Sequence, residues 1–287
     1  WSDGSTAQTL IANTAGTYTV TGTDANGCSA SDSMVIDVLN VDITQNDTTI
    51  CEGDSLVLEL GPLPGNLNSG LIAYYPFNGN ANDESGNGNN GTNNSATITS
   101  DRFGNLNSAY NFDFFISEIY NSTQFIPLGD NYTISIWFNS SNVNLTHQTI
   151  FRAVGLSEIG INFNHNNSNV ISLFVGSGSQ FWDNNRQGGI KNDYNNNQWY
   201  HLTLIRNKSI GNDYNYRLYI DGVLDNDIVD NYNYNNSAGF IIGQIGGGVE
   251  NFNGNLDDLG IWNRALSQNE IQELYNLQGY NLGSNYT

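Results

Sequence analysis

An acidic segment spaced by glycines is the part of the chain best suited to hold a metal ion. Asp83-Glu84-Ser85-Gly86-Asn87-Gly88 presents oxygen-bearing side chains at alternate positions of a turn that its glycines permit. Calcium prefers oxygen ligands of this kind. The string fits the front half of an EF-hand loop, but Asn94 stands near the position of the required bidentate Glu, so we exclude an EF-hand. A turn rich in Asp and Asn that holds no ion remains the alternative.

Two further loops combine aromatic rings with amides and charged groups. Flat rings stack on sugar rings, and amides and carboxylates bond sugar hydroxyls, so this combination predicts glycan binding. The candidate contact residues are Trp182, Asp183, Arg186 and Tyr194 in one loop and Tyr232 and Tyr234 in the other. Trp182 as a core residue, and the two tyrosines as decoration of a sheet edge, remain alternatives.

Catalytic patterns are missing from the sequence. His147, His165 and His201 share no metal-binding spacing, and His201 lies in a strand motif typical of a core histidine. Neither a Gly-x-Ser-x-Gly elbow nor a Gly-x-x-x-x-Gly-Lys loop is present. The nearest carboxylate pair, Asp225 and Asp227, follows a turn and is expected to be exposed. We therefore predict a protein that is not an enzyme.

Charge and composition limit the partners. The 287 residues carry 8 Lys+Arg against 28 Asp+Glu, a formal net charge of -20, which excludes nucleic acid and anionic membrane surfaces as partners. No apolar run is long enough to span a membrane. Only 13% of residues are charged, whereas about 49 are Asn, and there are two cysteines, which favours an exported protein. Because the chain begins at Trp1, we expect a piece of a longer secreted protein.

Short apolar runs between turn clusters predict an all-β fold, a two-sheet antiparallel sandwich or jelly roll. The predicted strands are Thr17–Thr21, Ser33–Val38, Leu71–Phe77, Thr133–Phe138, Val170–Val175, Trp199–Ile205, Arg217–Ile220, Phe240–Ile245 and Leu259–Trp262. One short helix is expected near the C-terminus, because Ser267 and Glu270 form a capping-box pattern before Ile271 and Leu274.

The composition changes near residue 60, where two of the four prolines fall in Gly61–Asn66. Thr, Ser, Val and Asp dominate before this point, and Asn and aromatic residues dominate after it. We therefore predict small β segments at 1–60, a linker at 61–67, one large domain at 68–278 and a tail at 279–287.

Six ordered motifs in the large domain carry a family resemblance. They are the stretch Gly70–Gly91, Asp101-Arg-Phe-Gly104 with Ala109-Tyr-Asn-Phe112, Thr133-Ile-Ser-Ile-Trp137, Gln198-Trp-Tyr-His-Leu202, Tyr219-Ile-Asp-Gly-Val223 and Gly254–Leu266. Together they resemble the laminin-G-like branch of the concanavalin A-like lectin/glucanase superfamily. The resemblance implies a jelly roll that binds carbohydrate or protein, commonly with one calcium ion.

The resemblance also implies the calcium ligands. In the family the Asp of the first loop meets the Asp of the closing strand, which corresponds to Asp83 and Asp257, with further oxygens from Asn80 and Ser85. Asp258 is next along the strand and should face the opposite way, toward solvent. The glycosidase pattern Glu-x-Asp-x-x-Glu of the superfamily is absent.

Residues 1–60 are similar to Ig-like or PKD-like repeats of secreted bacterial surface proteins. The segments Gly16–Val20, Asn26–Cys28 and Ile50–Leu58 carry this similarity. Cys28 and Cys51 would then belong to different repeats, and a disulfide between them remains the alternative.

Two functions follow from these patterns. The first is a non-catalytic carbohydrate-binding or adhesion module at the bacterial cell surface, monomeric as a fragment. It would bind a polysaccharide or glycan, including those of surface glycoproteins. The second is a structural or protein-binding spacer without a sugar site, and a polysaccharide-degrading enzyme is a more distant alternative.

Overall fold

The structure, a computed structural model, describes residues 6, 16–36, 66–154, 157–164, 169–177, 188–209, 213–230, 236–244 and 251–277. The chain divides into two compact units, Trp1–Pro64 and Gly65–Thr287. Among the described residues, no helix has the length and hydropathy needed to cross a membrane.

In the first unit, β1 (Gly16–Thr23) and β2 (Ser29–Ile36) pair as an antiparallel hairpin. Its turn forms because the Asp24 carboxylate accepts hydrogen bonds from the backbone N–H groups of Asn26 and Cys28, while Gly27 adopts a φ of +87°. The strand predicted at Thr17–Thr21 is confirmed. The similarity to Ig-like repeats stays a prediction, and so does the pairing of Cys28, because Cys51 lies outside the described residues.

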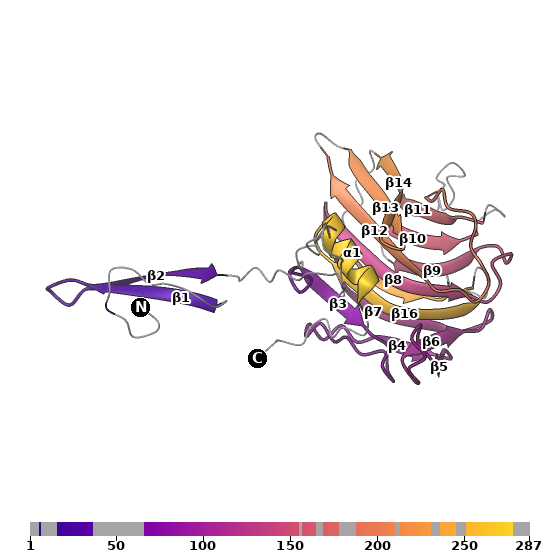
Figure 1. Ribbon diagram of the computed structural model, residues 1–287, viewed down its shortest axis with the longest axis horizontal. Coiled ribbons are helices and arrows are strands. Elements are labelled where there is room, and N and C mark those ends of the chain that lie inside the picture. Colours follow the sequence, from indigo (N-terminus) through magenta and orange to yellow (C-terminus); the bar gives the residue numbers. More distant parts are fainter. Residues whose placement is uncertain are drawn as a thin grey trace, which may run out of the picture. The chain divides into compact units, whose positions relative to one another are not determined.

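The second unit is a sandwich of two antiparallel sheets with one helix (Figure 1). Within the described residues, one sheet has the strand order β11-β10-β9-β15-β7-β4 and the other β14-β13-β12-β8-β16-β6-β5, with β3 also paired to β16. The strands are β3 (Leu71–Tyr75), β4 (Thr92–Asn94), β5 (Thr97–Thr99), β6 (Ala109–Phe112), β7 (Glu118–Leu128), β8 (Tyr132–Ser140), β9 (Gln148–Val154), β10 (Ser157–Phe163), β11 (Ile171–Ser177), β12 (Tyr200–Lys208), β13 (Tyr214–Ile220), β14 (Val223–Asp230), β15 (Asn236–Ile242) and β16 (Gly254–Trp262). This architecture confirms the predicted all-β sandwich.

Strand β8 shows why the larger sheet is covered on both faces. Ile134, Ile136 and Phe138 belong to the main core between the sheets. Residues at alternate positions, including Ser135 and Trp137, point to the opposite face because side chains alternate along a strand. All nine residues of β8 are nevertheless buried, so the second face is also covered.

Helix α1 (Gln268–Asn276) supplies part of that cover. Ser267 caps its N-terminus and forms the predicted capping box with Glu270, which confirms the helix expected from the sequence. Ile271 and Leu274 pack in a second apolar cluster with Trp262 of β16. Helix α1 thereby covers part of the outer face of the larger sheet.

Candidate functional site

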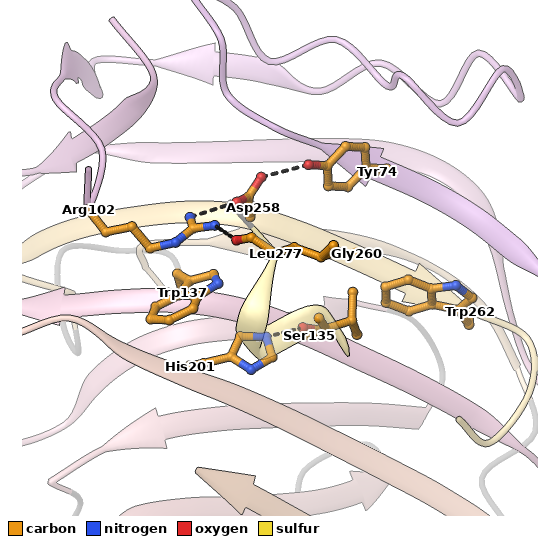
Figure 2. A pocket seen from close by; sticks show the side chains of 10 residues that line it. Tyr74, Arg102, Ser135, Trp137, His201, Asp258, Gly260, Trp262 and Leu277 are labelled. Carbon is orange, nitrogen blue, oxygen red and sulfur yellow. Dashed lines mark hydrogen bonds and ion pairs between the residues drawn. The ribbon is translucent and has the colours of Figure 1, made fainter. Parts of the chain in front are cut away.

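The site is organised by Arg102, which lies in the turn between β5 and β6. The Asp101 carboxylate accepts hydrogen bonds from the N–H groups of Phe103 and Asn105, and Gly104 adopts a φ of +84°. These local bonds explain why the Asp-Arg-Phe-Gly sequence forms a tight turn. The turn directs the Arg102 side chain onto the outer face of the larger sheet (Figure 2).

Two consecutive carboxylates of β16 meet this guanidinium because the strand contains a β-bulge. Asp257 pairs with Trp137 whereas Gly260 pairs with Ser135, so β16 has one residue more than β8 at this point. Asp258 takes the left-handed conformation, with a φ of +48°. The expectation that Asp258 faces solvent, opposite to Asp257, is therefore wrong, because the bulge breaks the alternation on which it was based.

The resulting network is largely buried, with side-chain exposures of 6% for Arg102, 3% for Asp257 and 21% for Asp258. Arg102 Nη1 lies 2.9 Å from Asp257 Oδ2 and 2.7 Å from Asp258 Oδ2. The Tyr74 hydroxyl donates to Asp258 Oδ1 at 2.7 Å, and Arg102 Nη2 donates to the backbone oxygen of Leu277 at 3.2 Å. Figure 2 shows Tyr74 and Arg102 converging on Asp258 from opposite sides.

One guanidinium faces two carboxylates, so the network carries an excess negative charge. Burial, followed by the neighbouring charge of Asp258, raises the pKa of Asp257 well above its usual range. Burial and the Asp258 carboxylate also raise the pKa of Tyr74, which keeps its hydroxyl protonated as a donor. The raised pKa of Asp257 favours the protonated form of this carboxyl, which reduces the excess negative charge.

Aromatic rings form the wall beneath Arg102. Its guanidinium carbon lies 4.4 Å from the centroid of Trp137 and 4.4 Å from that of Phe103. On its other side the Trp137 ring contacts His201, at 4.9 Å between centroids, and stacks on Tyr275 of α1 at 5.7 Å. Trp137 and Trp262 are buried, as expected from their strand motifs.

A small cavity lies between this wall and α1 (Figure 2). The centre of a water molecule can occupy about 20 Å³ of it, enough for a hydroxyl-sized group and too little for a sugar ring. Gly260 allows the Trp262 ring to pack directly over the strand, because a Cβ there would lie 2.4 Å from that ring. The lining residues are Tyr74, Arg102, Ser135, Trp137, His201, Asp258, Gly260, Trp262, Leu274 and Leu277.

Ser135 and His201 at the floor of this cavity have the spacing of a nucleophile and its base, at 2.8 Å between Oγ and Nε2. Both side chains are buried. Burial, and secondarily Arg102, lowers the pKa of His201 to about 3, so the imidazole is a poor proton acceptor at neutral pH. The imidazole Nδ1 has no hydrogen-bond partner among the described residues. The pair fits a buried structural histidine better than an activated nucleophile.

A shallow groove shares Tyr74, Arg102 and Asp258 with the cavity, and the centre of a water molecule can occupy about 30 Å³ of it. This volume admits a sugar hydroxyl, and a sugar ring would have to lie over the exposed Phe103 ring outside it. Phe103 lines it with 46% of its surface exposed, and its ring is backed by the Arg102 guanidinium. Carboxylate, amide and hydroxyl groups border this ring. The full lining is Tyr74, Pro76, Asn78, Asp101, Arg102, Phe103, Ser108, Asp257 and Asp258.

The four predicted calcium ligands have other partners in this arrangement. The Asp83 carboxylate accepts backbone N–H bonds from Tyr74, Ser85 and Asn89. Asp257 binds Arg102 instead, while Asn80 and Ser85 bond within their own loop or to β3. Among the described residues, no group of three or more His, Cys, Asp or Glu is suited to hold a metal. The calcium site at these four residues therefore remains a prediction from the resemblance.

Among the predicted glycan contacts, only Tyr194 lies within the described residues. Tyr194 is buried in the core, where its ring packs against Phe138, Phe163 and Tyr200, so it presents no free face to a sugar. This corrects the expectation of an aromatic shelf that includes Tyr194. The remaining candidates, Trp182, Asp183, Arg186, Tyr232 and Tyr234, lie outside the described residues.

Sequence reasoning did not select Arg102 or Phe103, although both stand in a motif that carries the resemblance. The available signal was an arginine next to an aspartate in a chain with only 8 Lys+Arg. The periodicity of the sequence could not reveal that the β5–β6 turn lies next to the bulge of β16 in the fold.

Comparison with solved structures shows the same fold in binding domains. Domain 4 of AbnA, a GH43 extracellular arabinanase from Geobacillus stearothermophilus solved with arabinotriose, matches with a TM-score of 0.56 and 21% identity, covering 72% of this chain and 98% of that one. The binding domain of Paraclostridial Mosquitocidal Protein 1 matches with a TM-score of 0.52 and 19% identity, covering 74% of this chain and 53% of that one. The botulinum neurotoxin serotype D binding domain matches with a TM-score of 0.51 and 16% identity, covering 74% of this chain and 52% of that one. The chain thus spans about half of each of the two toxin domains.

A search of curated proteins finds no match. A laminin G family model, described as the Concanavalin A-like lectin/glucanases superfamily, matches residues 90–272. This match covers most of the second unit and agrees with the two-sheet sandwich and the ordered motifs. The chain therefore belongs to the concanavalin A-like lectin/glucanases superfamily.

Proposed function

We propose that the chain is a non-catalytic carbohydrate-binding or adhesion module of a secreted, cell-surface bacterial protein. The groove at Phe103 carries this proposal, since an exposed ring lies beside carboxylate, amide and hydroxyl groups that can bond sugar hydroxyls. The arabinotriose complex of a domain with this fold supports carbohydrate as the ligand class. Export and surface location rest on the composition and on the resemblance of residues 1–60.

The Phe103 ring is suited to stacking for two reasons. One face lies against the Arg102 guanidinium at 4.4 Å, which holds the ring in place and limits the entropy that it loses on binding. Arg102 is itself held by Asp257 and Asp258, so the platform is anchored to β16. Preorganised rings of this kind give affinity without large rearrangement.

A glycan array probed with the full chain tests the proposal, with arabino-oligosaccharides included among the neutral probes. We expect binding that falls about tenfold or more in Phe103→Ala, corresponding to about 1.4 kcal/mol of lost stacking. Leu106→Ala is the matched control, because Leu106 is 79% exposed in the same turn and does not line the groove. If wild type binds no glycan, the spacer function is favoured instead. Equal loss in both variants would reject Phe103 as the platform.

A further inference from the structure

The charged groups around the groove are predominantly acidic. Asp101, Asp257 and Asp258 line it, and Arg102 is the one basic residue among its described lining residues. Formal charges therefore leave an excess of two negative charges, or one when Asp257 holds a proton. The chain as a whole, with a formal net charge of -20, adds to this field.

Arg102 offers no exposed donor to an incoming anion, because its Nε, which has no hydrogen-bond partner among the described residues, is buried. Its Nη1 already bonds Asp257 and Asp258, and its Nη2 bonds the Leu277 oxygen. The side chain is only 6% exposed, with its guanidinium between the rings of Phe103 and Trp137. A carboxylate or sulfate on a ligand would have to displace Asp258 to reach it.

Other basic side chains in the described part of the chain are also engaged. Four ion pairs are formed by Lys191 with Asp193, Lys208 with Asp130, Arg217 with Asp227, and Arg264 with Glu270. None of these basic residues lines the groove. None of these four side chains can therefore neutralise a negative charge on a ligand in the groove.

We infer that the groove selects uncharged glycans and rejects those bearing carboxylates or sulfates. This inference rests on the proposed function and specifies its substrate class. Sugar hydroxyls can donate to the groove carboxylates, whereas an anionic sugar brings like charges together in a partly desolvated site. We expect acidic glycans to bind at least tenfold more weakly than neutral ones of the same skeleton at low ionic strength.

The test compares glycans that differ only in charge. The probes are polygalacturonate, hyaluronan and sialyllactose, each compared with its own carboxyl-reduced form and each measured at 20 mM and 500 mM NaCl. For each glycan that binds, the neutral form should bind more tightly than the acidic form. This difference in affinity should shrink at high salt, because salt screens exposed charges. Tighter or equal binding of the acidic members would overturn the inference while leaving glycan binding intact. No binding to any array glycan would reject the proposed function, and this inference with it.

Two variants locate the effect. Asp101→Asn removes a groove charge, while its side-chain oxygen can still accept the backbone N–H bonds of Phe103 and Asn105, and only the bond from the Asn105 side-chain amide to Oδ2 is lost. This variant should reduce the difference in affinity between neutral and acidic glycans. Asp213→Asn makes the same change in net charge at an exposed position before β13, outside the groove, and should leave the difference unchanged. Equal effects of the two variants would show that only the net charge of the chain matters and would reject the groove as the selective element.

Discussion

Arg102 and Asp258 lie 156 positions apart in the sequence, and their side chains form a 2.7 Å ion pair in the second unit. The contact joins the β5–β6 turn to the bulged closing strand. Because the same arginine also backs the exposed Phe103 ring, the stability of this contact and the shape of the groove depend on each other.

Removing the cation should leave two buried carboxylates without compensation. We expect Arg102→Met to lower the free energy of unfolding by about 3–5 kcal/mol at pH 8, and by less at pH 5, because the raised pKa of Asp257 favours its protonation as the pH falls and so reduces the repulsion. Chemical denaturation at both pH values measures this. The double variant Arg102→Met/Asp258→Asn should recover part of the loss, and a double variant no more stable than the single one would contradict the assigned coupling.

Gly254, at the start of β16, should tolerate no side chain. Its φ is +147°, and a Cβ there would lie 2.0 Å from the backbone oxygen of Asn139. We expect Gly254→Ala to cost more than about 3 kcal/mol or to prevent folding, since strain and a backbone clash add. Gly79→Ala is the control, because Gly79 also has a positive φ, +82°, but open space around it, so only about 1 kcal/mol should be lost. Similar melting temperatures for the two variants would refute the steric argument.

Acid should destabilise the fold through His201. Burial lowers the pKa of His201 from 6.5 to about 3, so only the unfolded chain takes up this proton between those values. The stability contributed by the neutral imidazole is present above pH 6.5 and is lost as the pH falls, at no more than about 1.4 kcal/mol per pH unit.

The His201→Gln variant isolates this effect. Urea unfolding of wild type and variant at pH 7 and pH 5 should show the variant losing about 2 kcal/mol less than wild type on acidification. Carboxylates that titrate in the same range are common to both proteins and cancel in the comparison. Equal losses in the two proteins would show that His201 does not carry the pH dependence.

Calcium is tested by thermal melts in calcium and in chelator. The ion expected from the resemblance should raise the wild-type midpoint and leave that of Asp83→Asn unchanged, because a ligand that binds only the folded state stabilises it. Asp83→Asn should melt lower than wild type in both buffers, since an amide replaces a carboxylate that accepts three backbone N–H bonds. A calcium shift that is zero, or equal in both proteins, would reject the site at Asp83 and Asp257.

The sequence by itself determined the elements that depend on local patterns. The alternation in Thr133–Phe138 predicted the central strand β8, and the Ser267 and Glu270 pair predicted the start of α1, because strand periodicity and helix capping involve residues close in the chain. Ordered motifs then indicated the sandwich. Seven strands were not predicted, namely β4, β5, β6, β7, β9, β10 and β14. For β4 and β5 the reason is that segments of three mostly exposed residues carry no apolar period.

Only the tertiary structure decided which side chains form the site. Alternation placed Asp257 and Asp258 on opposite faces, but the pairing of β16 with β8 inserts a bulge that directs both toward Arg102. Tyr194 follows a polar loop in sequence and is nevertheless buried, because the packing of Phe138 and Phe163 creates a place for its ring. Register and burial arise from contacts between distant segments, and no local pattern of residues contains that information.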